Sequence, residues 1–82
     1  MQWSGYSGTI PLSMVHPGER AEVVQIRGGR GLSARLASMG FYPGATLEVI
    51  SNRKGPLIVA REGMRVALGF GMAHKVMVRP LQ

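Results

Sequence analysis

The sequence predicts a mainly β fold: a small, partly open barrel of the SH3-like kind, with about five short strands and one short α-helix. Twelve glycines and five prolines divide the 82 residues into short segments, which favours strands and turns over long helices. Hydrophobic residues make up 45% of the chain, which is enough for a compact core and too much for a disordered tail. At this length we expect a single domain around one core.

The first two predicted strands each follow a Pro-Gly pair. Residues 17–24 (PGERAEVV) align without gaps on residues 43–50 (PGATLEVI), and the first segment continues to Ile26. Proline presets the first torsion of a type II turn, and glycine accepts a positive φ at the second. Each pair is therefore predicted to form a tight turn that leads into a strand. The match is too short to indicate a duplication.

A glycine-rich loop and one short helix are expected between these strands. The loop covers residues 27–31 (RGGRG), and a helix is predicted over residues 32–39. Leu32, Leu36 and Met39 have the i, i+4, i+7 spacing of one helical face, and the following glycine is placed for a left-handed C-terminal cap. A helix of about two turns is not stable alone, so its apolar face must pack on the sheet.

The second half of the chain alternates turns and short apolar segments. A turn over residues 52–56 is predicted to pair a third strand, over residues 57–60, with the strand before it. A further turn covers residues 61–64. The next segment, residues 65–69 (RVALG), fits either a strand or a single helical turn.

The two ends of the chain complete the predicted domain. A glycine-rich bend over residues 69–74 leads into a last strand over residues 75–79, which Pro80 is expected to end. Residues 1–11 are predicted to form a loosely held N-terminal arm, and residues 12–82 the barrel domain.

The composition argues against most kinds of active site. The chain has no Cys and no Asp, which excludes thiolate metal sites, a Cys nucleophile and a Ser-His-Asp triad. The loop over residues 27–31 lacks the Gly-Lys-Ser/Thr that ends a Walker motif. His16 and His74 leave weak transition-metal association open but define no site. We therefore predict a non-enzymatic protein, without catalytic residues and without a defined cofactor or metal site.

The charge balance fits either a solvated basic surface or an anionic partner. Ten Lys and Arg residues against four Glu residues give a formal net charge of +6, which suits nucleic acid, an acidic protein or an anionic membrane. Residues 17–28 resemble the start of the RNA-binding KOW motif, so RNA binding is the alternative function. RNA-binding barrels stack bases on exposed aromatic rings, and such rings are few here. They are Trp3, Tyr6, Phe41, Tyr42 and Phe70, of which Phe41 and Phe70 are predicted to lie in the core.

No apolar run approaches the roughly 20 residues needed to span a bilayer. The first residues carry neither the basic start nor the apolar stretch of a signal peptide. A cytoplasmic location is expected.

The order and spacing of these segments resemble the FeoA family of ferrous iron transport accessory proteins. The resemblance covers about residues 12–80 and is most specific over residues 35–44 (RLASMGFYPG). It implies an SH3-like barrel in the cytoplasm, with iron transport as its role. It further implies a partnership with FeoB, the membrane ferrous iron transporter that carries a G-protein domain. Modulation of that domain, and a peripheral position at the inner face of the membrane, would follow from this partnership.

Two surfaces are predicted to contact the partner. The first is the helix after the glycine-rich loop, with Arg30, Arg35 and the exposed edge of Phe41-Tyr42. The second is the hairpin tip formed by Arg53 and Lys54, which suits an acidic partner or an anionic lipid. Changing Arg35 or Tyr42 to Ala is expected to weaken partner binding and to leave the fold intact.

Overall fold

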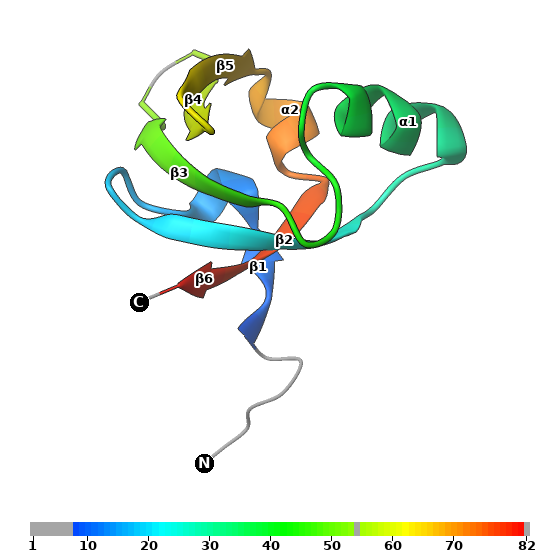
Figure 1. Cartoon of the computed structure of the whole chain (residues 1–82), viewed down its shortest axis with the longest axis horizontal. Helices are drawn as coiled ribbons and strands as arrows, with labels where there is room; N and C mark the ends of the chain where they lie inside the picture. The colour runs from blue at the N-terminus through cyan, green and yellow to red at the C-terminus, as the bar shows by residue number, and fades with distance from the viewer. Residues whose placement is uncertain (1–7, 54, 82) are drawn as a thin grey trace.

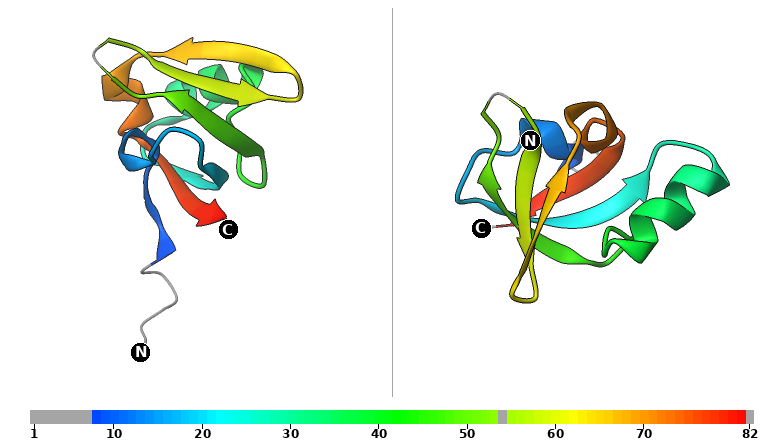
Figure 2. Two further views of the ribbon diagram at one scale, coloured as in Figure 1. Left: turned by 90° about the vertical axis from the view of Figure 1, so that its left-hand side faces the viewer. Right: turned by 90° about the horizontal axis from the view of Figure 1, so that it is seen from above.

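The structure, a computed structural model, describes residues 8–53 and 55–81. Within these ranges the chain forms one six-stranded antiparallel sheet with the strand order β1-β6-β2-β3-β4-β5 (Figure 1). The elements in chain order are β1 (Ile10–Pro11), the 3₁₀ helix η2 (Leu12–Met14), β2 (Arg20–Ile26), α1 (Arg30–Ser38), β3 (Thr46–Ser51), β4 (Leu57–Arg61), β5 (Met64–Leu68), α2 (Phe70–Ala73) and β6 (Val76–Leu81). The sheet curls around a common core, and α1 extends from one end of it (Figure 2).

The five predicted strands are confirmed as β2 to β6, and the ambiguous segment over residues 65–69 is a strand. A sixth strand, β1, pairs with β6 and falls within the segment expected to be an arm. Trp3 and Tyr6 lie outside the described residues. The predicted helix is present and begins at Arg30, two residues earlier than expected.

Both Pro-Gly pairs form the tight turns that the sequence predicts. Gly18 has a φ of 90° and Gly44 a φ of 97°, as the third residue of a type II turn requires. A backbone hydrogen bond closes each turn, at 3.1 Å across residues 16–19 and 2.9 Å across residues 42–45.

The two turns also join β2 to β3 in equivalent ways. The Gly18 N–H donates to the Val49 carbonyl at 2.7 Å, and the Gly44 N–H donates to the Val23 carbonyl at 2.8 Å. The pairing register shifts just after Val23 in the β2–β6 ladder and just after Val49 in the β3–β4 ladder. These residues occupy equivalent positions in the aligned segments. The repeated sequence therefore corresponds to a local two-fold arrangement of β2 and β3.

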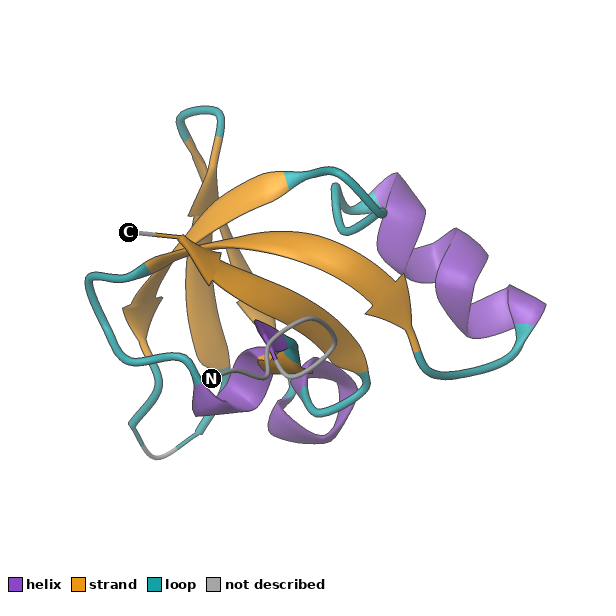
Figure 3. Cartoon of the chain, turned by 90° about the horizontal axis from the view of Figure 1, so that it is seen from below, coloured by secondary structure: helices purple, strands orange, loops and turns teal. Residues whose placement is uncertain are grey.

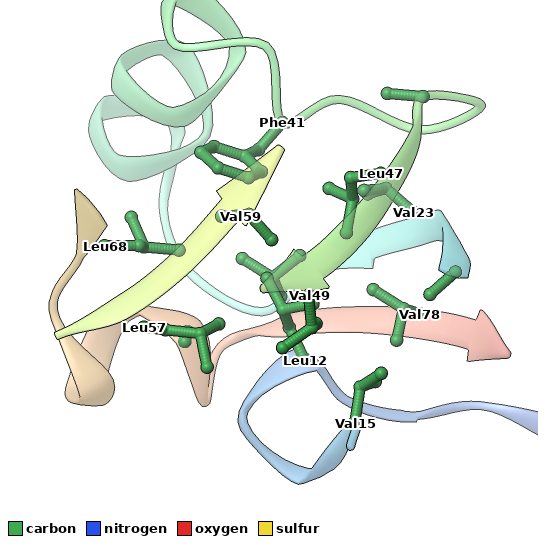
Figure 4. Packing of buried hydrophobic residues seen from close by; sticks show 14 of the residues in the cluster. Leu12, Val15, Val23, Phe41, Leu47, Val49, Leu57, Val59, Leu68 and Val78 are labelled. Atoms are coloured by element: carbon green, nitrogen blue, oxygen red, sulfur yellow. The ribbon is translucent and has the colours of Figure 1, made fainter. Parts of the chain in front are cut away.

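One buried cluster fills the barrel (Figure 4). Because side chains alternate between the two faces of a strand, β2, β3, β4 and β6 each direct two alternate residues into it. The buried hydrophobic residues are Leu12, Val15, Ala21, Val23, Leu36, Phe41, Ala45, Leu47, Val49, Leu57, Val59, Leu68, Ala73, Val76 and Val78. Leu36 is the fully buried residue of the predicted helical face, whereas Leu32 and Met39 are partly buried against the cluster.

α1 ends in a left-handed glycine, as predicted. Gly40 has a φ of 97°. Its N–H donates to the Ala37 carbonyl at 3.0 Å, and the Phe41 N–H donates to the Leu36 carbonyl at 2.9 Å. This pair of bonds is the Schellman motif, which satisfies the last carbonyls of a helix. The motif turns the chain so that Phe41 enters the core next to the end of α1.

The short helix α2 was not predicted, and its position overturns the expectation for Phe70. The glycine-rich bend over residues 69–74 contains one helical turn, in which the Ala73 N–H donates to the Gly69 carbonyl at 2.9 Å. This turn buries Ala73 and packs Met72 against the core. Phe70 is directed outward and is 50% exposed. The prediction that Phe70 lies in the core is therefore wrong.

The prediction that Pro80 ends the last strand is also wrong, because β6 continues to Leu81. Pro80 lies opposite Ala21 of β2. Val23 directs its backbone N–H to Ala45, on the β3 side, and Ala21, two residues earlier, faces the same way. No ladder bond is required between Ala21 and Pro80, so a proline is tolerated at this position.

η2 and α2 lie together at one opening of the barrel (Figure 3). The hydroxyl group of Ser13, a buried residue of η2, is hydrogen-bonded to Nδ1 of His74, just after α2, at 3.1 Å. No helix in the described ranges has the length and hydropathy of a membrane-spanning segment.

Candidate partner-binding surface

α1 presents two arginines to solvent. Arg30 and Arg35 are both exposed, because the helix buries Leu36 and packs Leu32 against the core on another side. In the described part of the chain, the ion pairs are His16–Glu19, Arg61–Glu62 and Arg79–Glu22, so neither arginine of α1 has a carboxylate partner there. Positions five residues apart are separated by about 140° around a helix. Arg30 and Arg35 therefore lie on different sides of α1.

Tyr42 is held in place by a residue that the sequence did not single out. The guanidinium of Arg61, in β4, lies over the Tyr42 ring, with 4.9 Å between Cζ and the ring centroid. One of its nitrogens, NH2, also donates a hydrogen bond to the Tyr42 hydroxyl group. The Arg61 side chain is only 15% exposed and forms an ion pair with Glu62 at 3.1 Å. Tyr42 itself is 41% exposed, so its outer edge remains accessible, whereas Phe41 is buried and the prediction that it shares this exposed edge is wrong.

We expect replacement of Tyr42 by Phe to lower the free energy of unfolding by about 0.5–1.5 kcal/mol, because the Arg61 NH2 group loses its acceptor while the ring contact is kept. Tyr42→Ala is expected to cost more, since the cation–π contact, worth about 0.5–1 kcal/mol, is lost as well. Urea unfolding followed by circular dichroism measures both changes.

A double-mutant cycle with Arg61→Met isolates the interaction. A coupling energy of zero between Tyr42→Phe and Arg61→Met would show that the two side chains do not stabilise each other.

The loop between β3 and β4 lies at the opposite end of the molecule from α1 (Figures 1 and 2). Arg53 is exposed in the loop between β3 and β4, whereas Lys54 lies outside the described residues. Arg53 lines an open groove with Pro56 and the exposed Phe70. The structure therefore does not combine the α1 candidates and Arg53 into one surface.

The two histidines are engaged separately. His16 lies 3.7 Å from a carboxylate oxygen of Glu19, and His74 is hydrogen-bonded to Ser13. Among residues 8–53 and 55–81, no three His, Asp or Glu side chains are grouped closely enough to hold a metal ion.

Comparison with known proteins identifies the family. The model of the FeoA domain matches residues 10–80. A protein of Methanocaldococcus jannaschii that carries the name Fe(2+) transport protein A is 43% identical over 68 residues, which is 83% of either chain.

Solved structures agree with this match. A crystal structure described as iron uptake regulatory protein (FeoA) superimposes with a TM-score of 0.84 at 44% identity, covering 89% of this chain and 99% of the other. The FeoA of Stenotrophomonas maltophilia, solved with zinc and described as a prokaryotic SH3 domain protein, gives a TM-score of 0.70 at 25% identity. That match covers 82% of this chain and 86% of the other. The predicted SH3-like fold is thereby confirmed, and the chain belongs to the FeoA family of ferrous iron transport proteins.

Proposed function

We propose that this protein is a non-enzymatic accessory protein that binds a FeoB-type membrane ferrous iron transporter from the cytoplasmic side. The binding surface is the solvent-exposed part of α1, whose two different sides carry Arg30 and Arg35, together with the outer edge of Tyr42. Membership of a ferrous iron transport family supports the choice of partner. Contact with the G-protein domain of the transporter would alter its rate of GTP hydrolysis.

The observation that carries the choice of surface is that α1 exposes two arginines without a carboxylate partner in the described part of the chain. Burial of Leu36 anchors the helix on the barrel, so the arginines are presented on an anchored helix. Unpaired charge on a fixed element steers an acidic partner and contributes to specificity. Arg53 at the opposite end forms a second, independent candidate contact.

Affinity purification tests this proposal. The tagged protein is mixed with detergent-solubilised FeoB-type transporter after nuclease treatment, at low and at moderate salt. We expect recovery of the transporter with the wild-type protein, and at least tenfold less with the double variant Arg30→Glu/Arg35→Glu. GTP hydrolysis by the transporter is measured on the same samples and is expected to respond to the wild-type protein only.

Two controls make the result specific. Arg65→Glu changes the charge at an exposed position of β5, away from α1, and is expected to bind like the wild type. Arg53→Glu tests the hairpin separately. Equal loss in all variants would indicate a non-specific effect of net charge. Recovery of nucleic acid alone, lost steeply as salt increases, would contradict the proposal and favour the RNA-binding alternative.

A further inference from the structure

A groove separates α1 from the last part of β2, which is one of the strands in the middle of the sheet. We call it the β2–α1 groove; it is lined by residues 24–26 of β2, by Ser33, Ala34 and Ala37 of α1, and by residues 41–43. Its volume is about 430 Å³. Figure 2 (right) shows α1 running beside this end of β2.

The β2 side of the groove is an open strand edge. β3 pairs with β2 over Arg20–Glu22, and the last backbone hydrogen bonds on this side of β2 join Val23 to Gly44 and Ala45, just before β3. From Gln25 onward, the pairing of β2 within the described ranges is with β6 alone. The side that faces α1 therefore carries no partner strand there. An open edge of this kind can accept an added strand through main-chain hydrogen bonds.

The backbone of Ile26 faces into this edge. The Arg27 N–H donates to the Lys75 carbonyl at 2.7 Å, on the β6 side. Backbone groups alternate in direction along a strand, so the N–H and C=O of Ile26 point the other way, toward α1. These two groups offer an added strand one hydrogen-bond donor and one acceptor, placed as in a β-ladder.

The α1 side of the groove leaves room for side chains. Ser33, Ala34 and Ala37 face β2 across the groove, and none of these small residues fills the space. Phe41, Tyr42 and Pro43 complete the lining. The groove therefore lies between a strand edge and a helix, and its lining is largely apolar. An extended segment with small or medium apolar side chains fits it.

One end of the groove is basic. Arg27 follows directly after Ile26, and Arg30 begins α1 on the same helical face as Ser33, Ala34 and Ala37. Neither arginine takes part in an ion pair within residues 8–53 and 55–81. None of the four Glu residues of the chain lines the groove. An acidic side chain on the bound segment would complement this end.

We propose that the β2–α1 groove binds an extended peptide segment of a partner protein by adding it as a strand to the edge of β2. Apolar side chains of the segment lie against Ala34 and Ala37, and an acidic side chain reaches Arg27 and Arg30. The identity of the partner as the transporter rests on the proposed function above, whereas the binding mode rests on the groove alone.

A synthetic octapeptide serves as the probe. It carries two glutamates at each end and alternating threonine and valine between them, with acetylated and amidated termini. In an NMR titration we expect shift changes of the amides at residues 24–27, 33, 34 and 37. Hydrogen exchange of the Ile26 amide should slow at least tenfold, because its N–H gains an acceptor. The same peptide methylated at its four central amide nitrogens cannot form the ladder, and its affinity should be at least tenfold lower.

Filling the groove should block the peptide. Ala37→Leu and, independently, Ala34→Leu are expected to weaken binding at least tenfold; both positions are exposed, so circular dichroism should remain unchanged. The matched control is Ala67→Leu, at an exposed position of β5 outside the groove. No binding at millimolar peptide, equal affinity of the methylated peptide, or shift changes centred on Phe70 and Arg53 would each overturn the inference.

The transporter assay separates the two proposals. If the octapeptide does not add to β2 while the wild-type protein and Ala37→Leu bind the transporter equally well, the groove inference is wrong and the proposed function stands. If the octapeptide adds to β2 but the wild-type protein does not bind the transporter, the proposed function is wrong and the groove remains a peptide site.

Discussion

Replacement of Phe41 by Ala is expected to lower the free energy of unfolding by about 3–5 kcal/mol. Phe41 is the largest of the fully buried side chains and is 1% exposed. Its ring belongs to the cluster that contains Leu36 and Val59 (Figure 4), so its removal leaves a cavity where α1 meets the sheet. The free energy of unfolding of a natural domain is roughly 5–15 kcal/mol, so this change alone removes a large fraction of the total stability. Urea unfolding followed by far-UV circular dichroism measures it.

The matched control is Phe70→Ala, because the same residue type lies half exposed on α2. Its removal leaves no enclosed cavity, and the expected loss is about 1 kcal/mol or less. If the two variants lost the same free energy of unfolding, the buried ring of Phe41 would not contribute more to stability than an exposed ring, and the cavity argument would fail.

The comparison of Phe41 with Phe70 shows which part of the fold could be predicted. Phe41 follows a helix with clear periodicity and a capping glycine, and these local signals place it at the C″ position of a Schellman motif, which contacts the core. Phe70 stands in the segment 69–74, which is too short to show a period. The single helical turn of α2 sets which residues of this segment face inward. They are Met72 and Ala73, whereas the sequence predicted Phe70.

The candidate site was predictable only in part, for a related reason. The exposure of Arg30 and Arg35 follows from the apolar face of α1, which is a local pattern. The contact between Tyr42 and Arg61 joins residues 19 positions apart through the packing of a loop on β4. The open edge of β2 depends on where β3 ends its pairing. The sequence signal that could have indicated a groove is the face of α1 that carries only small side chains, where Ala34 and Ala37 share one side.

The arrangement of β2 beside β3, by contrast, corresponds to the repeated Pro-Gly turns in the sequence. Equivalent Pro-Gly turns place Gly18 beside Val49 and Gly44 beside Val23, and these are equivalent positions in the two aligned segments. A sequence match of eight residues could not establish this arrangement, since similar turns occur in unrelated hairpins. The reciprocal hydrogen bonds and the matching register shifts do establish it in the structure.

Replacement of Gly40 by Val is expected to lower the free energy of unfolding by about 2–3 kcal/mol. Gly40 has a φ of 97°, a region that a β-branched residue adopts only with strain. An added Cβ would also lie 3.0 Å from Cδ of Arg61, whose guanidinium holds Tyr42. The substitution therefore affects the Schellman motif at the end of α1 and the Arg61–Tyr42 contact together.

The same helix provides the control for this experiment. Gly31 lies inside α1 without a positive φ, and a Cβ there meets nothing within 4 Å. Gly31→Ala is therefore expected to raise the free energy of unfolding by about 0.5–1 kcal/mol, because Ala favours the helix. Thermal melts of the two variants should shift in opposite directions from the wild type. An unchanged melting temperature for Gly40→Val would mean that the end of α1 tolerates a side chain there, and the capping argument would fail.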